Sequence, residues 1–490
     1  MSSVISGLNP GNLWKYFAGM CAIPHQSKNE TAIREWLIGL GKERNFEVRT
    51  DEVGNVCIAI PATPGYENAP TVVLQGHMDM VCEKNNDTVH DFAKDPIVLV
   101  RDGDWIKAKG TTLGADNGIG LAAGLAFLDE TDAVHGPLEI LATVDEETGL
   151  TGAFNLSPEL MTGKYLLNLD SEEDGALYVG CAGGADVKIN FDVTTAPVRA
   201  TDKIIDITIK GLMGGHSGLN INENRGNALR ILARMLKNLQ RQGTEFHLVN
   251  IEGGSAHNAI PREATARIAV ANENAEKAMQ TLNAKWDSVK FEYAKREKNM
   301  SVAIEYSNTM IPTAFTRTLT DGIIDVMLMV PNGVLTMSQD IEGLVESSSN
   351  LATVKTKDKV LTVHISTRSS VGSVIPEIQE TAYIAGLRCG ASVEIGQGYP
   401  AWQPDMDSPL LKAGIAVFKE LFGKDPAIKA IHAGLECGVI GEKYPGMKML
   451  SFGPEIHGAH SPDECVSIST VERFWDYLKA LLAAAAQGKL

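Results

Sequence analysis

The hydrophobic positions of the first 184 residues follow two alternating spacings. Residues 31–43 place apolar side chains at helical spacing, and residues 118–128 are small and apolar enough for a buried helix. Short apolar runs between turn residues indicate four buried strands, at residues 53–60, 71–75, 138–144 and 165–169. Strands that alternate with helices predict an α/β domain, with a mixed sheet covered by helices on both faces.

The pattern changes after Gly183-Gly184, where apolar and polar residues begin to alternate as they do in half-exposed strands. Such strands are predicted at residues 186–193, 203–210, 264–271 and 360–366, with helices at residues 228–239 and 274–289. One-sided helices on alternating strands predict an open α+β sandwich. Residues 360–366 weakly resemble residues 204–210, which suggests an internally duplicated insert, although no strong repeat is present.

Helical segments and short buried strands return from Ser408 onward. The simplest organisation is one discontinuous α/β domain, residues 1–184 and 401–490, interrupted by an inserted α+β domain, residues 185–400. A chain of 490 residues is also too long for one small core, so two domains are the default expectation.

The composition of the chain excludes some classes of binding partner and indicates a cellular compartment. The net charge of -17 argues against a nucleic-acid or anionic-membrane partner, because both are polyanions. No window approaches the roughly 20 apolar residues of a membrane span, and the N-terminus lacks the features of a secretory signal. Seven scattered cysteines, none in a Cys-x-x-Cys pair, are typical of reduced thiols in the cytoplasm. We therefore expect a cytoplasmic protein whose metal ligands, if any, are His, Asp and Glu.

His77-Met78-Asp79 directly follows one of the predicted strands. Alternate residues of a strand point to the same face, so His77 and Asp79 emerge side by side where the strand ends. A histidine that binds a metal usually needs a carboxylate to fix its tautomer and orientation. His-x-Asp alone is common, so a metal site requires partners elsewhere in the chain.

Four acidic residues lie at other strand ends or in a glycine-rich turn, namely Asp116, Glu146, Glu147 and Asp170. Taken singly, Asp116 could cap a helix, the two glutamates could be solvated charges and Asp170 could close a turn. Ligands of open α/β sheets bind beyond the carboxyl ends of the strands. Four carboxylates clustered there beside His77 would repel one another strongly without a cation.

The chain carries five motifs in the order found in the cocatalytic dinuclear zinc peptidases and aminoacylases. They are Gly76-His77-Met78-Asp79, Gly114-Ala115-Asp116-Asn117-Gly118, Asp145-Glu146-Glu147-Thr148-Gly149, Asp170 and His460-Ser461-Pro462-Asp463-Glu464. The resemblance covers essentially the whole chain, and the ordered set is specific. It implies a zinc-peptidase catalytic domain interrupted by a lid and dimerisation domain, and hence a homodimer.

The resemblance also implies a metal-ligand set. Asp116 would bridge two divalent ions, His77 and Asp170 would complete one site, and Glu147 and a late histidine the other. A mixed His and carboxylate set suits Zn²⁺ and is compatible with Mn²⁺ or Co²⁺.

His457 and His460 both compete for the last ligand position. His460 begins the segment that resembles the family motif, so we choose it. The resemblance further implies a cis peptide bond after the bridging residue, between Asp116 and Asn117.

The formal charges of the implied metal centre are consistent with a hydrolytic mechanism. Two divalent cations, the carboxylates of Asp116, Glu147 and Asp170, and one bridging hydroxide sum to zero. Two metals that share a water lower its pKa and make it a nucleophile. Glu146 would act as the general base and pass the proton to the leaving amine, while Asp79 would orient His77.

Five further residues are candidates for substrate binding through the resemblance. His216, in a glycine-rich turn, would donate to the oxyanion, and Arg368 would bind a terminal carboxylate, with Asn258 nearby. His432 and Glu436 would read the ends of the substrate, Glu436 by pairing with a free amine. From the residues alone, His216 could equally be a surface histidine and Arg368 a structural ion pair.

We therefore expect a metal-dependent dipeptidase that hydrolyses unblocked dipeptides, including Xaa-His. An N-acyl amino-acid deacylase on the same scaffold, a tripeptidase and a non-catalytic binding homologue are the alternatives. The intact Glu146 and the full ligand set argue against the non-catalytic homologue.

Overall fold

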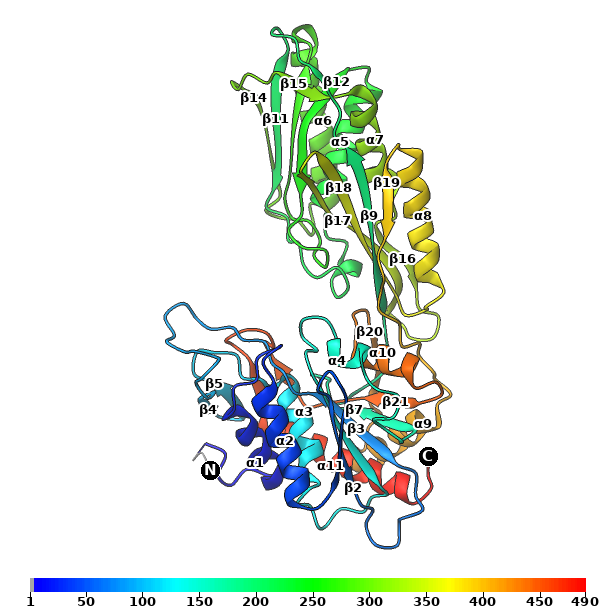
Figure 1. Ribbon diagram of the computed structural model, residues 1–490. Helices are drawn as coiled ribbons and strands as arrows, with labels where there is room; N and C mark the ends of the chain where they lie inside the picture. The colour runs from blue at the N-terminus through cyan, green and yellow to red at the C-terminus, as the bar shows by residue number, and fades with distance from the viewer. Residues whose placement is uncertain (1–3) are drawn as a thin grey trace. The chain divides into compact units, whose positions relative to one another are not determined.

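The computed structural model describes residues 4–490, which form two compact units (Figure 1). Unit 1 comprises the chain up to Cys181, Pro404–Ala430 and Leu435–Leu490, and unit 2 comprises Ala182–Gln403 and Ile431–Gly434. Within residues 4–490, every helix is too short or too polar to cross a membrane.

Unit 1 is built on a mixed eight-stranded sheet. In spatial order its strands are β1 (Glu47–Thr50), β2 (Val56–Ile60), β6 (Leu138–Thr143), β3 (Val72–His77), β7 (Tyr165–Asn168), β21 (Lys448–Ser451), β8 (Ala176–Cys181) and β20 (Ala427–Ile431). Its helices are α1 (Gly11–Cys21), α2 (Thr31–Glu43), α3 (Ala115–Ala126), α4 (Thr151–Phe154), α9 (Pro409–Phe422), α10 (Glu436–Lys443) and α11 (Ile468–Ala486).

Helices cover both faces of this sheet. Met449 and Leu450 are neighbours in β21 and therefore point to opposite faces. Gly414 of α9 lies against Leu450, whereas Gly441 of α10 lies against Met449. The α/β domain with a mixed sheet that the alternating pattern predicts is thus confirmed.

A smaller antiparallel sheet brings a late segment of the chain beside an early one. Its strands are β22 (Ile456–His457), β23 (Cys465–Ser467), β5 (Trp105–Ala108) and β4 (Leu99–Asp102), in that order. β23 pairs with β5, with Cys465 opposite Lys107. The loop between β22 and β23, which contains His460, is therefore anchored at both ends.

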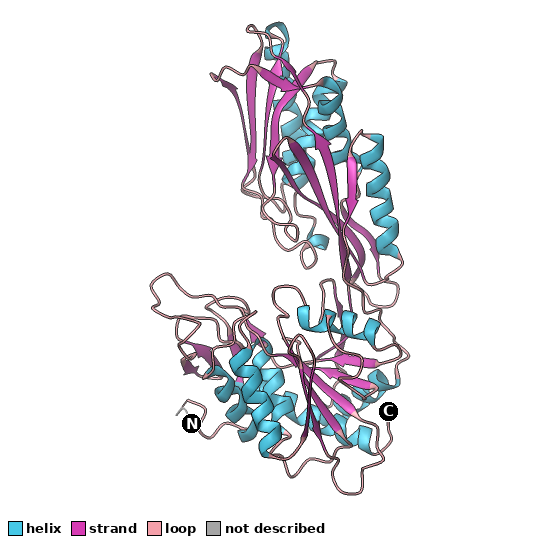
Figure 2. Cartoon of the chain, viewed as in Figure 1, coloured by secondary structure: helices cyan, strands magenta, loops and turns pink. Residues whose placement is uncertain are grey.

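Unit 2 contains a nine-stranded sheet whose helices gather on one face (Figure 2). Its main path is β14 (Ser301–Ser307), β11 (Lys203–Lys210), β13 (Ala264–Val270), β12 (Phe246–Gly253), β17 (Val345–Lys357), β18 (Val360–Ser369), β9 (Gly183–Asp192) and β19 (Ser392–Ile395), with β16 (Gly333–Met337) beside β17. The helices are α5 (Ala228–Arg241), α6 (Ala275–Tyr293), α7 (Arg317–Met329) and α8 (Val374–Arg388). β10 (Thr195–Pro197) and β15 (Thr313–Phe315) form a separate pair.

Alternation explains how this layer packs. Ile205, Ile207 and Ile209 of β11 are fully buried in one core with the apolar side of α5, whereas the alternate positions Asp206, Thr208 and Lys210 are half-buried or exposed. Asn227 caps α5, because its side chain accepts a hydrogen bond from the backbone N–H of Arg230. The predicted α+β insert with one-sided helices is confirmed.

The topology shows that unit 2 is duplicated. β11, α5, β12, β13, α6 and β14 form one βαββαβ half, with sheet order β14-β11-β13-β12. β9, α7, β17, β18, α8 and β19 form a second βαββαβ half, whose order β19-β9-β18-β17 is the same. The first half is inserted after β9, so the second half is split in sequence. In this scheme β18 corresponds to β13, not to β11 as the weak resemblance between residues 360–366 and 204–210 suggested.

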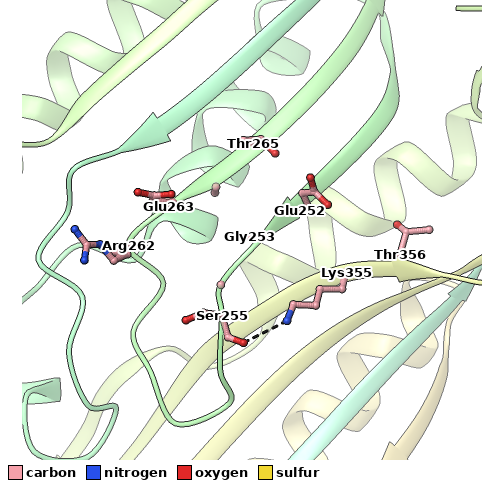
Figure 3. Close-up of a pocket in the computed structure, with 10 residues that line it drawn as sticks. Glu252, Gly253, Ser255, Arg262, Glu263, Thr265, Lys355 and Thr356 are labelled. Carbon is pink, nitrogen blue, oxygen red and sulfur yellow. Dashed lines mark hydrogen bonds between the residues drawn. The ribbon is translucent and has the colours of Figure 1, made fainter. Parts of the chain in front are cut away.

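The two halves join edge to edge through one residue pair, Gly253 of β12 opposite Val354 of β17. A polar pocket of about 730 Å³ lies beside this pair. Figure 3 shows its charged lining, where Lys355 Nζ donates a hydrogen bond to the backbone carbonyl of Ser255 at 3.2 Å.

Candidate functional site

Three parallel strands of unit 1 carry the predicted acidic cluster at one edge of the sheet. β3 pairs in parallel with β6 and with β7, and His77 at the end of β3 lies opposite Thr143 at the end of β6. Glu146 and Glu147 follow β6, and Asp170 follows β7. The structure therefore brings these four residues together where the sequence predicted.

Asp116 lies between two groups of possible metal ligands. One group is His77, Asp116 and Asp170, and the other is Asp116, Glu147 and His460, with the ligand atoms of each group within 4.8 Å of one another. Asp116 Oδ1 is 3.1 Å from His77 Nε2, and its Oδ2 is 3.2 Å from His460 Nε2. The peptide bond between Asp116 and Asn117 is cis, which confirms that expectation.

Asp79 contacts the Nδ1 side of the His77 imidazole, opposite the Nε2 atom that would bind a metal. His77 Nδ1 lies 3.0 Å from the backbone carbonyl of Asp79 and 3.4 Å from its Oδ1. This side of the ring is therefore occupied, and Nε2 faces Asp116 and Asp170. The Asp79 carboxylate also accepts hydrogen bonds from Ser27 Oγ and from the backbone N–H of Glu146, so it fixes the β6 loop as well.

The two competing histidines have different surroundings. His460 Nε2 is 3.1 Å from Glu147 Oε2 in addition to its contact with Asp116. His457 Nε2 instead pairs with Glu455 at 2.7 Å, and its ring lies over Trp105 with 4.9 Å between centroids. The geometry thus favours His460 as the late ligand.

The electrostatics of the cluster fit divalent cations. Although burial opposes protonation, Asp170, Asp116 and Asp79 raise the pKa of His77 well above its usual value. Asp116 and Glu147 raise the pKa of His460 to about 11. Burial, reinforced by neighbouring carboxylates, raises the pKa of Asp170 well above its ordinary range. Protons on these groups offset the crowded negative charge, and metal ions would replace them.

One orphaned atom supports the same fit. Among the residues that the structure describes, no hydrogen-bond partner reaches the buried Oε1 of Glu147. A buried carboxylate oxygen without a donor is costly unless it binds a cation. The donor set of imidazole nitrogens and carboxylate oxygens is suited to Zn²⁺ and similar ions.

Glu146 lies beside the ligand groups. One of its carboxylate oxygens lies within 4.8 Å of the ligand atoms of His77 and Glu147. Burial, together with Glu436, Glu147 and Asp116, raises the pKa of Glu146 well above its usual value. A carboxyl group that holds a proton this readily suits proton transfer.

Glu436 faces the interior of unit 1. The side chain has no exposed surface, and its Oε2 accepts hydrogen bonds from Gln75 Nε2 at 2.5 Å and Thr143 Oγ1 at 2.7 Å. Asn168 Nδ2 donates to Gln75 Oε1, which links the ends of β3 and β7. Among the described residues the buried Oε1 of Glu436 has no hydrogen-bond partner, so one oxygen of this carboxylate is left for a ligand and the expected contact with a substrate amine stays a prediction.

His216 and Arg368 lie together in unit 2. His216 Nδ1 accepts hydrogen bonds from the backbone N–H groups of Gly218 and Leu219, so a proton on the ring belongs on Nε2. Burial, with Arg368 and His257, lowers the pKa of His216 to about 4, which keeps the ring neutral. Arg368 Nη2 lies 3.5 Å from His216 Nε2, and Nη1 donates to the Tyr399 hydroxyl. Two converging donors favour an anionic ligand.

Two other predicted residues belong to unit 2. His432 lies in the short Ile431–Gly434 return, where its Nε2 is 2.7 Å from Ser348 Oγ, and burial lowers its pKa to about 3. It was expected in the returning segment of the α/β domain, so this assignment is corrected by the packing. Asn258 is exposed, and its backbone carbonyl accepts a hydrogen bond from the N–H of Ser217.

Sequence reasoning overlooked two residues that support the cluster. Gln75 lies two positions before His77 on β3 and organises the buried network around Glu436. Glu464 contacts the Asp116 loop. Alternation along β3 could have indicated Gln75, and the last position of His-Ser-Pro-Asp-Glu could have indicated Glu464.

Comparisons with known proteins assign the chain to a family. Residues 73–484 match the family described as Peptidase family M20/M25/M40. The chain is 43% identical over 480 residues to the cytosol non-specific dipeptidase of Escherichia coli (strain K12), covering 98% of this chain and 99% of that protein.

Solved structures agree. The aminoacylhistidine dipeptidase of Vibrio alginolyticus is 44% identical and superposes with a TM-score of 0.91, covering 99% of this chain and 98% of that one. The aminopeptidase PepT of Bacillus cereus shares the fold, with a TM-score of 0.56 at 17% identity over 98% of this chain and 99% of that one. The resemblance inferred from the five motifs is confirmed, and the chain belongs to peptidase family M20/M25/M40.

Proposed function

We propose that this protein is a metal-dependent dipeptidase that hydrolyses unblocked dipeptides, including Xaa-His. One observation carries the proposal: Asp116 is shared by two ligand groups, and Glu146 lies beside them. The relatives named as a cytosol non-specific dipeptidase and an aminoacylhistidine dipeptidase support the substrate class. His77, Asp116, Asp170, Glu147 and His460 would hold two divalent ions, with Zn²⁺ the first choice and Mn²⁺ or Co²⁺ compatible.

The ions would polarise the scissile carbonyl and lower the pKa of a water molecule. Glu146 takes the proton of the attacking water and delivers it to the leaving amine. Asp79 keeps His77 in its tautomer and, through the backbone N–H of Glu146, holds the loop that carries the base. The residues of this chain therefore orient the reactants and move one proton.

We assign recognition of the substrate's terminal carboxylate to Arg368, and donation to the tetrahedral oxyanion to His216. The support is the neutral His216 ring with Nε2 as its donor, next to the Arg368 guanidinium. Asn258 and His432 complete the polar surroundings of this loop.

A panel of four substrates tests the function. We expect chelator-sensitive hydrolysis of Ala-His, with kcat/KM at least tenfold lower for N-acetyl-Ala-His, for Ala-His amide and for Ala-Ala-His. N-acetylation or amidation removes a charged end and leaves a binding group of the enzyme unpaired, which costs about 1–3 kcal/mol, and the extra residue of Ala-Ala-His separates the two ends. The measurement is initial rate by product chromatography, before and after chelation and after restoring Zn²⁺.

The two enzymatic alternatives give different outcomes of this panel. Preference for the N-acetyl compound would replace the dipeptidase by an N-acyl amino-acid deacylase, and preference for Ala-Ala-His would indicate a tripeptidase. Hydrolysis that survives chelation would contradict the metal centre.

We also propose a cytoplasmic homodimer formed through unit 2. Support comes from four apolar side chains of the second half, each roughly half exposed: Met329, Ile384, Leu387 and Ile395. Ile384 and Leu387 are three positions apart on α8, and Ile395 is on the neighbouring edge strand β19. A mass by light scattering near the 52.6 kDa of one chain would contradict the dimer. Within residues 4–490 no disulfide bond joins any of the seven cysteines, as expected in a reducing compartment.

A further inference from the structure

The carboxylate of Glu464 binds four consecutive backbone N–H groups. Oε2 accepts from Leu113 at 2.6 Å and Gly114 at 3.0 Å, and Oε1 accepts from Ala115 at 2.7 Å and Asp116 at 3.2 Å. The side chain is only 2% exposed. Burying a charged carboxylate raises the free energy of the folded state, and here the four N–H donors offset that cost.

These donors belong to a segment that does not hold its own shape. Gly114 precedes α3 in a left-handed conformation and offers no side chain to cap the helix. Asp116 and Asn117 have non-helical backbone angles within the first turn. The first N–H groups of a helix have no hydrogen-bond acceptor inside the helix. Glu464, which follows Asp116 by 348 positions in the sequence, provides the acceptor oxygens here.

The same residue is tied to the histidine turn. Glu464 follows His460 by four positions, and its backbone N–H donates to the carbonyl of Ser461 at 3.1 Å. The short segment from His460 to Glu464 thus contacts Asp116 twice. The His460 ring lies beside the Asp116 carboxylate, and the Glu464 carboxylate accepts a hydrogen bond from the Asp116 backbone N–H. Glu464 is therefore in contact with the segments that carry both proposed ligands.

We propose that Glu464 is a positioning residue that couples the Asp116 loop to the His460 turn, so that both metal sites form together. The inference rests on the proposed dinuclear centre. Glu464 touches neither substrate nor metal, and acts by fixing where Asp116 and His460 meet.

The test is calorimetric titration of metal-free Glu464→Gln with Zn²⁺. The amide keeps the size of the side chain, but its NH₂ group opposes two of the four N–H donors. We expect the affinity of at least one site to fall about 10- to 100-fold, as for other residues that support metal ligands. At limiting Zn²⁺ kcat for Ala-His falls, saturating Zn²⁺ restores most of it, and KM stays within about twofold of wild type.

Glu139→Gln is the matched control. Glu139 is also buried and accepts backbone N–H groups, from Thr162 and Gly163, but it lies near the start of β6 rather than at the ligand end. Its substitution should lower the unfolding temperature without changing Zn²⁺ affinity. Glu464→Asp, which keeps the charge with a shorter reach, should give an intermediate affinity and serves if the glutamine variant fails to fold.

The outcomes separate the inference from the proposed function. If Glu464→Gln and Glu464→Asp lose thermal stability but bind Zn²⁺ with wild-type affinity, Glu464 is purely structural and the inference is wrong. If the wild-type chain itself binds no Zn²⁺, the proposed metal centre fails, and the inference fails with it.

Discussion

Glu146→Gln will lower kcat for Ala-His by about 10²- to 10⁴-fold, the usual contribution of a general acid–base residue, while two metal ions remain bound. The amide fills the same space beside His77 and Glu147 but cannot accept the proton of the attacking water. KM should change little, because the substituted group acts on the reacting water rather than on the substrate's ends. Steady-state kinetics and metal content by mass spectrometry are the two measurements.

Glu147→Gln is the paired control, because it changes the neighbouring carboxylate in the same way. We expect this variant to lose one ion, since Glu147 Oε2 faces His460 and its buried Oε1 has no hydrogen-bond partner within residues 4–490. If Glu146→Gln loses an ion instead and Glu147→Gln keeps both, the roles of ligand and base must be exchanged.

Asp116→Ala will abolish binding of both ions and reduce kcat/KM by more than about 10³-fold, because metal ions contribute several kcal/mol to transition-state stabilisation. The side chain reaches both ligand groups, through Oδ1 toward His77 and Oδ2 toward His460. Metal content after dialysis is the direct measurement.

Two histidine variants bracket this result. His460→Ala should cost one ion, and His457→Ala should cost none, because His457 pairs with Glu455 and lies over Trp105. Loss of a single ion from Asp116→Ala would show that Asp116 does not bridge, and loss of an ion from His457→Ala would reverse the choice between the histidines.

The sequence was most informative where local pattern decides position. His77 and Asp170 follow apolar runs that pair as parallel strands β3 and β7, and the carboxyl ends of parallel strands meet at one edge. Alternation alone then places Asp79 beside His77. The positions of these three residues depend on the backbone geometry of a few consecutive residues, which can be predicted from a single sequence.

Other parts of the site depend on contacts between distant segments. The regular part of α3 begins after the non-helical Asp116 and Asn117, as the predicted start at residue 118 expects, but the contact of Glu464 with the backbone before it joins segments from opposite ends of the chain. His432 belongs to unit 2 through Ser348, which no local pattern reveals. The enclosure of Glu436 by Gln75 and Thr143 likewise appears only after folding.

The split arrangement of unit 2 also dictates the order in which its strands find their partners during synthesis. The contiguous half, from β11 to β14, has all its strands once residue 307 has emerged from the ribosome. Within residues 4–490 the strands that pair with β9 are β18 and β19, so β9, made earlier, has no strand partner until residue 360 and beyond have been translated. Such long-range pairing slows folding. An unpaired strand with alternating apolar residues therefore remains in the nascent chain after the contiguous half has been made, and its edges are open to non-native pairing until β18 is translated.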